Sequence, residues 1–456
     1  MASPASVKRP AARYTLKKLN NNHKNQFREH ITMARTSLAG LGLLGLCALQ
    51  TAHADGYSQN NFLLGDWNGE RTHLHEQGVD FLFTYVNELA YNTQGGDPHK
   101  GTYSDQLMAD AQFDLQRLLG WEGAALRATF TNRNGESLTR EANTGTLLAA
   151  QEIYGRGSVT RLVQLYYQQA LYADRLLLKV GRLPMSGDVF PFSCTFQNLT
   201  FCGAVPGYIT PNWFTWPVSQ WGAALQAQLA DDWWLNTAIY QVNPRFTENA
   251  QGLNFGSPSG TTGHLAVAEL TWKPTLAGLP GSYRVGVWHN TGDFDDIYLD
   301  VEGQPIGLTG NTPERHDQAH GWYAMAQQRV YQSPSNPARG LTLFSNFIQS
   351  DRDVSDIERV WHLGAFVGGP FAARPQDEIG LALGRLEVNP RSARRAQQAS
   401  ASERRADVEY PVELYYGLQL SPALTLRPNV QYTRNPGGFD HDRSVVVWGL
   451  KTVVSF

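Results

Sequence analysis

Charge and long apolar segments are both scarce in this chain. Only 17% of its 456 residues are charged, and beyond residue 54 no apolar run approaches the roughly 20 residues that a membrane-spanning helix needs. The chain is nevertheless 11% aromatic and holds 12 tryptophans, which excludes general disorder. The composition leaves a soluble protein or a membrane β-barrel, because a barrel hides its lipid-facing residues by alternation along each strand.

The signatures of common catalytic sites are also missing. The segment 256–260 has a proline where the serine of a G-x-S-x-G motif would stand, and neither H-E-x-x-H nor a glycine-rich phosphate loop is present. Asp110 and Asp114 share a strand face and imitate a glycosidase carboxylate pair. Spacing in sequence does not establish the separation that such chemistry requires. We therefore predict that the protein is not an enzyme and that it holds no cofactor and no metal.

The first 54 residues are typical of a secretory leader. Basic residues around Met33 precede the apolar run 38–49, and Ala52-His53-Ala54 has the small-x-small form of a cleavage site. We expect the mature chain to begin at Asp55, and we leave open whether Met1 or Met33 is the true start.

Removing this leader makes the chain acidic. Residues 1–54 hold eight of the 38 Lys and Arg and one of the 41 Asp and Glu, so 30 basic and 40 acidic residues remain. This balance gives no support to nucleic-acid binding. Two cysteines also remain, Cys194 and Cys202. In an oxidising compartment we expect them to form a short disulfide, with two free buried thiols as the alternative.

After an N-terminal segment, residues 55–78, the hydrophobic period changes to two. In that segment Asp66 is placed to cap a short helix that ends before Gly78. Residues 79–456 then alternate between apolar and polar positions, which predicts strands, several with the roughly 9 to 11 residues of a tilted membrane strand. The 16 predicted strands are 79–91, 107–117, 124–133, 159–172, 176–182, 219–230, 233–242, 263–273, 282–291, 319–331, 340–349, 359–367, 376–387, 408–420, 424–433 and 443–456.

The connections between these strands alternate between long and short. Residues 92–106 and 134–158 are long, whereas 118–123 and 173–175 are short. A soluble sandwich would show the same strand alternation, but this asymmetry is typical of outer-membrane barrels, which have short periplasmic turns and long external loops. We therefore predict an all-β fold, a 16-stranded antiparallel outer-membrane β-barrel over residues 79–456, with a short N-terminal helix.

One long connection differs from the others. Residues 181–216 hold Cys194, Cys202, four prolines and many aromatic residues. This composition indicates a long loop that is fixed at several points. By strand count it is the third external connection, and we predict that it folds into the lumen and narrows it. Its Tyr, Trp and Phe side chains would then stack on the apolar face of a sugar ring.

If the apolar strand faces contact lipid, the polar faces line the lumen. Mixed charges and amides suit sugars, because sugar hydroxyls both donate and accept hydrogen bonds. For any single charge the alternative is ordinary solvation and cross-strand pairing. The lumen residues predicted from alternation are Glu88, Asp110, Gln112, Asp114, Gln116, Arg127, Arg133, Gln226, Gln228, Glu413, Arg427 and Gln431.

Two external segments carry concentrated charge. Asp293, Asp295, Asp296 and Asp300 lie in one loop and suggest a Ca²⁺ site, but the glycine and terminal glutamate of an EF-hand loop are absent, so we expect a solvated acidic loop. The segment 391–405 is rich in arginine. One interpretation is that it meets anionic lipopolysaccharide or draws acidic solutes to the mouth. We expect instead that it is a mobile solvated loop.

Three motifs resemble the carbohydrate-selective porins of the OprB type. They are LLGDWNGERTHLHEQGVDF followed by Glu88 and Gly95-Gly96, KVGRLPMSGDVF with CTFQNLTFC, and VELYYGLQLSPALTLRPNVQYTRNPGG with a terminal strand that ends in Phe456. The resemblance covers nearly the whole mature chain. It implies a 16-stranded outer-membrane barrel, passive diffusion of monosaccharides such as glucose, and an eyelet of Arg and acidic side chains. The eyelet positions that it implies are Arg71, Glu88, Arg182, Glu413 and Gln431.

Together these observations predict a sugar porin of the bacterial outer membrane. Its expected partners are small sugars, outer-membrane lipid and lipopolysaccharide, and the choice between monomer and trimer stays open. A porin for anionic solutes such as sugar acids is the alternative, and a secreted all-β protein that binds or hydrolyses glycans is an alternative of another class. The predicted eyelet and lumen residues are Arg71, Glu88, Asp110, Asp114, Arg127, Arg182, Glu413, Arg427 and Gln431.

Overall fold

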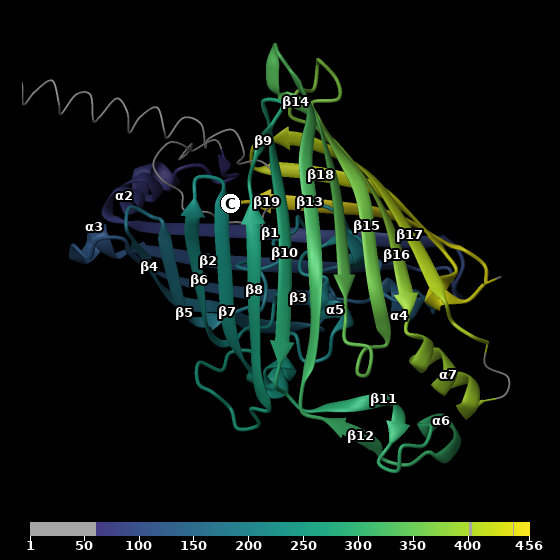
Figure 1. The fold of residues 1–456 in the computed structure, drawn as a ribbon. Helices are drawn as coiled ribbons and strands as arrows, with labels where there is room; N and C mark the ends of the chain where they lie inside the picture. Colours follow the sequence, from purple (N-terminus) through teal and green to yellow (C-terminus); the bar gives the residue numbers. More distant parts are fainter. Residues whose placement is uncertain (1–60, 401–403, 441) are drawn as a thin grey trace, which may run out of the picture. The chain divides into compact units, whose positions relative to one another are not determined.

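The computed structural model describes residues 61–400, 404–440 and 442–456, and the predicted leader lies outside them. Its main sheet is antiparallel and closes on itself, because β1 pairs with both β2 and β19, as Figure 1 shows. The barrel strands are β1 (Val79–Gln94), β2 (Gly101–Asp114), β3 (Ala124–Gly135), β4 (Val159–Leu171), β5 (Leu176–Leu183), β6 (Gln220–Ala230), β7 (Trp233–Val242), β8 (Gly263–Trp272), β10 (Leu279–Asn290), β13 (Ala319–Ser333), β14 (Asn336–Gln349), β15 (Ile357–Gly368), β16 (Glu378–Val388), β17 (Val408–Ser421), β18 (Leu424–Arg434) and β19 (Val445–Ser455). The short β9 (Thr275–Leu276) adds a further pairing to β10.

The prediction of a 16-stranded antiparallel barrel is confirmed, and each predicted range overlaps one barrel strand. The largest difference concerns β2, which begins at Gly101 and ends at Asp114. There α3 (Leu115–Leu119) begins, and Asp114 caps it by accepting the backbone N–H groups of Gln116 and Arg117 at 2.9 and 3.1 Å. The prediction that Gln116 lies on a strand and that Asp114 serves the lumen is therefore wrong, because Asp114 ends the strand as a helix cap.

The connections define two different ends of the barrel. The long-loop end carries connections 136–158, 184–219, 243–262, 291–318 and 389–407, and the short-turn end carries connections such as 172–175, 231–232 and 334–335. The short helices of the connections are α4 (Leu138–Glu141), η3 (Leu199–Phe201), α5 (Pro206–Ile209), η4 (Pro244–Thr247), η5 (Asn249–Gln251), α6 (Ile306–Thr309), α7 (Pro390–Ala399) and η6 (Pro436–Gly438). Within the described residues, no helix is long and apolar enough to cross a membrane.

The N-terminal helix forms where the sequence predicts it. α2 (Glu70–Gln77) follows the single turn η2 (Trp67–Gly69). Asp66 stabilises its first turn by accepting the backbone N–H of Thr72 at 2.9 Å. Gly78 ends the helix with a φ of 95°, a conformation that glycine adopts without steric cost.

Alternation divides each barrel strand into an outward apolar face and an inward face. On β19, Trp448 is 58% exposed on the outward face, whereas Val447 and Lys451 are buried on the inward face. Outward aromatic side chains gather near both strand ends, the pattern of aromatic girdles in membrane barrels. Near the long-loop end they are Tyr91, Tyr103, Trp322, Trp361, Tyr410, Tyr432 and Trp448, and near the short-turn end they are Phe81, Phe83, Trp233, Trp272 and Tyr283.

Connection 184–219 enters the barrel and forms an apolar core with the inward faces of β7, β8, β10 and β13 to β17. The ring centroids of Phe190 and Tyr323 lie 5.0 Å apart, and those of Phe196 and Tyr415 are also 5.0 Å apart. The loop aromatics in this core, all at most 6% exposed, are Phe190, Phe192, Phe196, Phe201, Trp213 and Phe214.

The inward course predicted for this loop is thus observed, but the stacking role predicted for its aromatics is wrong for these six. They are buried against the inward faces of the barrel strands and are not open to the lumen. Within this loop, all of which the structure describes, Tyr208 and Trp216 are the aromatic side chains that stay partly exposed.

At the long-loop end, a small hairpin of β11 (Phe294–Asp300) and β12 (Pro313–His316) is joined to α7. Figure 1 shows the hairpin, α6 and α7 gathered at that end. One Arg391 nitrogen, Nη2, lies 2.7 Å from both carboxylate oxygens of Asp296, which is 1% exposed and also lies 2.9 Å from His316 Nε2. Asp300 caps a local turn through the N–H groups of Glu302 and Gln304.

Two expectations for these loops are therefore wrong. The described part of segment 391–405 begins as a helix rather than a mobile loop, because Asn389 caps it and Pro390 occupies its first turn. The acidic loop is not simply solvated, because Asp296 is buried in an ion pair.

The Asp296 contacts predict a loop attachment that fails in acid. Burial raises the pKa of Asp296, but hydrogen bonds from His316, two backbone N–H groups and Arg391 outweigh it, so the pKa is lowered. The stabilisation is therefore complete above the unfolded-state pKa of about 3.9 and is lost as the pH falls through the lower folded-state pKa. We expect the distribution of distances between spin labels at positions 302 and 394 to stay narrow at pH 4 and to broaden only at a lower pH. Asp296→Asn should broaden the distance distribution already at pH 7, whereas the exposed control Asp295→Asn should leave it narrow. A narrow distribution in Asp296→Asn would show that Asp296 does not hold α7 to the hairpin.

Candidate functional site

The inward loop 184–219 is held by a disulfide within itself and by charged groups on the barrel wall. Cys194 and Cys202 are joined in the disulfide, which closes the segment that lies against β1, β17, β18 and β19. The preceding connection, 136–158, lies beside it, because the N–H of Glu152 donates to the carbonyl of Gln197 at 2.9 Å. Two connections therefore meet inside the barrel, and the wall must satisfy the polar groups of both.

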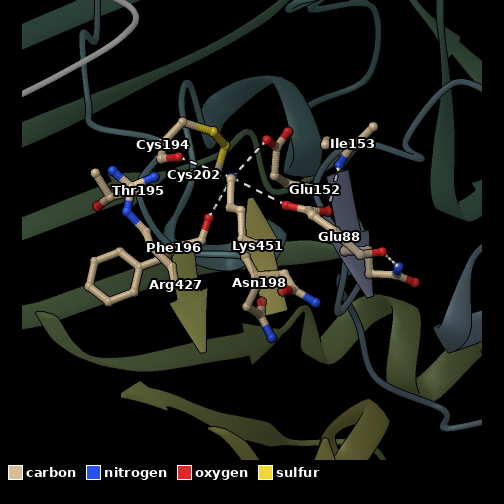
Figure 2. A network of polar contacts seen from close by, with 12 residues as sticks. Glu88, Glu152, Ile153, Cys194, Thr195, Phe196, Asn198, Cys202, Arg427 and Lys451 are labelled. Carbon is tan, nitrogen blue, oxygen red and sulfur yellow. Dashed lines mark hydrogen bonds and ion pairs between the residues drawn. A yellow bond between two sulfur atoms is a disulfide. The ribbon is translucent and has the colours of Figure 1, made fainter. Parts of the chain in front are cut away.

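Lys451 of β19 is the centre of this contact (Figure 2). Its side chain is 3% exposed, and its Nζ donates to the carbonyl oxygens of Cys194 at 3.1 Å and Phe196 at 3.0 Å. The same Nζ lies 3.2 Å from Glu88 Oε1 and 3.0 Å from Glu152 Oε1. One buried ammonium group therefore joins three parts of the chain. A buried charge of this kind is stable only while its partners are in place.

Buried glutamates on the wall bind the N–H groups of the same connections. Glu413 of β17 is the clearest case, since its two oxygens accept the N–H groups of Gln197 at 2.8 Å and Asn198 at 2.7 Å. A carboxylate in this position satisfies donors that an irregular backbone inside a barrel cannot share with a strand. The other such bonds run from Ile153 to Glu88 (3.2 Å), from Phe190 to Glu269 (2.9 Å) and from Leu147 to Glu409 (2.9 Å). Glu409 also accepts the N–H of Gly437, in the connection between β18 and β19, at 2.8 Å.

Neutral amides complete the attachment. Gln431 of β18 accepts from Asn198 Nδ2 at 2.9 Å and donates to the carbonyl of Ala150 at 3.0 Å, so it contacts both connections. Asn429, two residues earlier on the same face, donates to Gln197 Oε1 at 2.9 Å. The predicted residues Glu88, Glu413 and Gln431 are thus brought together, but their polar atoms contact the two connections or, for Glu88 Oε1, Lys451 of β19.

Asp110 and Arg127 form a second pair on the inward faces of β2 and β3. Both side chains are buried, and the guanidinium binds the carboxylate through two bonds of 2.9 Å. Thr129 also donates to Asp110. Paired in this bidentate way, the two charges compensate each other.

Arg182 lies on the outward face of the barrel, away from the inward loop. It shares a face of β5 with Val180, which is 47% exposed on the outward side. Its Nη1 donates to the carbonyl of Asn254 at 2.7 Å, and its guanidinium carbon lies 4.0 Å from the centre of the Phe246 ring. Arg182 therefore holds connection 243–262 against the barrel.

Arg71 is also remote from the inward loop. Its Nη1 donates to the carbonyl of Phe81 at 3.1 Å, and its Nη2 donates to the carbonyl of Phe456 at 2.7 Å. It ties α2 to the last residue of the chain.

The inward side chains that keep contact with the lumen lie between the loop and the short-turn end. Arg427 of β18 shares its face with Asn429 and Gln431 and is the register partner of Lys451. It is partly exposed, and its guanidinium makes no hydrogen bond or ion pair with any described residue. Partly exposed glutamines on inward faces extend this surface, namely Gln112, Gln168, Gln226, Gln327 and Gln419.

Connection 136–158 contributes a second guanidinium, that of Arg156. Burial lowers the pKa of Arg156, and the nearby Tyr208 ring interacts with it electrostatically. Within the described chain Arg156 has no hydrogen-bonded or ionic partner. Trp216, which remains partly exposed, donates its Nε1 to Gln106 at 3.1 Å.

Glu152 lies close to the sulfurs of Cys194 and Cys202. Both sulfurs are bonded to each other, so they are not available as thiolate ligands. This cluster does not offer a metal site.

Lys451, Glu269 and Glu409 were not among the residues predicted from the sequence. A signal for Lys451 was present, because the inward residues before it and after it on β19, from Val445 to Val453, are Val445, Val447, Gly449 and Val453. A single lysine among apolar inward residues requires a buried partner.

Comparisons with known proteins agree with this architecture. Residues 98–456 match the model of the family described as "Carbohydrate-selective porin, OprB family". The chain is 38% identical to Porin B of Pseudomonas aeruginosa over 440 residues. This alignment covers 92% of this chain and 96% of that protein. It is 35% identical to the putative porin QuiX of Acinetobacter baylyi, over 91% of this chain and 99% of that protein. The high-pH structure of Pseudomonas putida OprB superposes with a TM-score of 0.85 at 36% identity, over 88% of this chain and all of that one.

Proposed function

This chain belongs to the OprB family of carbohydrate-selective porins, and from that premise we propose that it passes small neutral sugars by passive diffusion. It is a channel protein of the outer membrane rather than an enzyme. We propose that monosaccharides such as glucose cross the constriction made by loop 184–219 and then meet the polar inward faces below it.

The observation that carries this proposal is the chemistry of the side chains left open to the lumen. The charged side chains of the wall nearest the loop, such as Glu88, Glu413 and Lys451, make hydrogen bonds to backbone groups of the connections. The surface that remains is a set of partly exposed glutamine amides on several strands, together with Arg427, whose guanidinium makes no hydrogen bond or ion pair with a described residue. Amides donate and accept as sugar hydroxyls do, so they replace the water shell of a neutral sugar without favouring one charge sign.

The alternative substrate class is a small anion such as a sugar acid. Arg127 and Arg182 no longer support it, since both are bound within the protein. Arg427 and Arg156 do support it, because neither guanidinium forms an ion pair with a described residue, although the charge of Arg427 also acts on the nearby Glu378. Swelling of proteoliposomes in glucose and in gluconate separates the two classes. Faster entry of glucose supports the proposal, faster entry of gluconate favours the alternative, and no swelling in either would reject a porin.

We expect Arg427→Leu to weaken sugar binding in the lumen. Hydrogen bonds to a charged group contribute about 1.5–3 kcal/mol, so the glucose concentration that half-blocks the ion current should rise by about tenfold or more. The measurement is single-channel recording in planar bilayers with glucose added stepwise.

Arg352→Leu is the matched control, because Arg352 is an exposed arginine in connection 350–356 and the substitution is the same. It should leave the half-blocking concentration unchanged. An unchanged value in Arg427→Leu would remove Arg427 from the solute site.

A further inference from the structure

Three histidines lie on the outward faces of three adjacent strands, close to the long-loop end. They are His264 of β8, His289 of β10 and His320 of β13, and all three are exposed. β10 pairs with β8 on one side and with β13 on the other, and Figure 1 shows these three strands next to one another. The residue beside each histidine faces inward and is 0% exposed, namely Leu265, Asn290 and Ala319.

The strand register brings these three side chains close together. His289 and His320 are register partners, so their Cβ atoms lie roughly 4.5–5.5 Å apart. On the other side, His289 is opposite Ala266, two residues after His264. His264 is therefore the diagonal neighbour of His289, at roughly 7–8 Å, a separation that long and aromatic side chains bridge.

The His320 ring is held by a carboxylate. Its Nδ1 lies 3.2 Å from Oδ2 of Asp351, and the same oxygen accepts the backbone N–H of His320 at 3.0 Å. The Asp351 side chain is only 10% exposed. A carboxylate bound to one ring nitrogen fixes the orientation of the imidazole and leaves the other nitrogen, Nε2, as a ligand, the arrangement that orients metal-bound histidines.

The other two rings are free to move. The rings of His264 and His289 make no hydrogen bond or ion pair with any described residue. As they stand, the ring nitrogens of the three histidines do not all lie within 4.8 Å of one another. An ion therefore has to draw the rings together by rotation about χ1 and χ2, and no other contact of the His264 and His289 rings opposes this rotation.

We propose that His264, His289 and His320 bind one divalent transition-metal ion at the outer rim of the barrel, and that Asp351 positions the His320 ring. Imidazole nitrogens suit Zn²⁺, Ni²⁺ and Cu²⁺, whereas Mg²⁺ and Ca²⁺ prefer oxygen ligands. Three imidazoles leave a fourth position of Zn²⁺ to water or to a solute atom. Because these residues are far apart in the chain, no sequence motif contains them, and no metal was predicted from the sequence.

The position of the three histidines makes such an ion accessible from outside. His320 lies two residues before Trp322 of the outward girdle, on the long-loop side of it. Long loops face the outside in outer-membrane barrels. The ion therefore reaches the site without crossing the lumen, and its binding leaves the path of the sugar unchanged.

The test is isothermal titration calorimetry of the full barrel in detergent, without a polyhistidine tag. We expect one Ni²⁺ or one Zn²⁺ to bind per barrel and Mg²⁺ to give no binding heat. His289→Asn removes the central ligand and should weaken Ni²⁺ binding by about tenfold or more. Asp351→Asn should weaken it about 10- to 100-fold, as the loss of a carboxylate behind a metal-bound histidine does. The unfolding temperature of the metal-free protein should be unchanged in both variants, which separates a lost site from a damaged barrel.

His99→Asn is the matched control, because His99 is an exposed histidine in the connection between β1 and β2. It should leave Ni²⁺ binding unchanged. The proposal is overturned if the wild type binds neither Ni²⁺ nor Zn²⁺, or if His289→Asn binds Ni²⁺ as tightly as the wild type. One ion per two barrels would also overturn it, since the ion would then join two copies. Unchanged binding in Asp351→Asn would overturn the positioning role of Asp351.

Discussion

Replacing Lys451 with methionine is expected to release the inward loop and open the channel. The substitution keeps the length of the side chain but leaves Glu88 and Glu152 without their cation and the carbonyls of Cys194 and Phe196 without their donor. Removing one partner of a buried charge pair costs about 3–5 kcal/mol. We expect a loss of stability of that order, a larger single-channel conductance and weaker block by glucose.

Two further variants separate the lost charge from the altered shape. The double variant Glu88→Gln/Lys451→Met removes one uncompensated carboxylate and should recover part of the lost stability. Lys273→Met, the same substitution in the turn between β8 and β10, should leave the conductance unchanged. Normal conductance and glucose block in Lys451→Met would show that the ammonium group does not hold the loop.

Replacing Phe196 with alanine should release the same loop through its apolar contacts. The Phe196 ring lies 5.0 Å from Tyr415, 5.7 Å from Phe366 and 5.6 Å from Phe201, measured between centroids. Truncating a buried phenylalanine costs about 3–5 kcal/mol, because the cavity is only partly refilled. We expect a lower unfolding temperature and a conductance that fluctuates between levels as the loop moves.

Phe371→Ala is the control for this experiment, because Phe371 is exposed in the turn between β15 and β16. It should change neither the unfolding temperature nor the conductance. If Phe196→Ala behaves in the same way, packing against β14, β15 and β17 does not position the loop.

The barrel itself follows from local patterns in the sequence. Alternation with a period of two indicates each strand because one face meets lipid and the other does not. The long and short connections indicate the two ends. The third connection is recognisable from Cys194 and Cys202 and from its concentration of aromatics. These signals depend on residues close together in the chain, so no distant contact has to be known.

The partner of each inward polar residue was not predictable in the same way. Alternation places Glu88 and Glu413 on the inward face, but it does not distinguish a carboxylate that faces water from one that accepts backbone N–H groups of a distant loop. Glu413 is separated from Gln197 by more than half of the barrel sequence. The contacts of Asp114 and Arg182 were unpredictable for the same reason. Asp114 caps α3, and Arg182 is covered by connection 243–262.

The account rests on the claim that wall charges hold the inward loop by its backbone, and hydrogen exchange of individual amides tests it most directly. The amides of Ile153, Phe190, Gln197 and Asn198 donate to buried glutamates of the wall. We predict that these four amides exchange as slowly as amides of the barrel strands in the wild-type protein. In Lys451→Met, the amides of Gln197 and Asn198 should exchange much faster than in the wild type. Exchange of all four at the rate of an exposed loop in the wild-type protein would contradict the account.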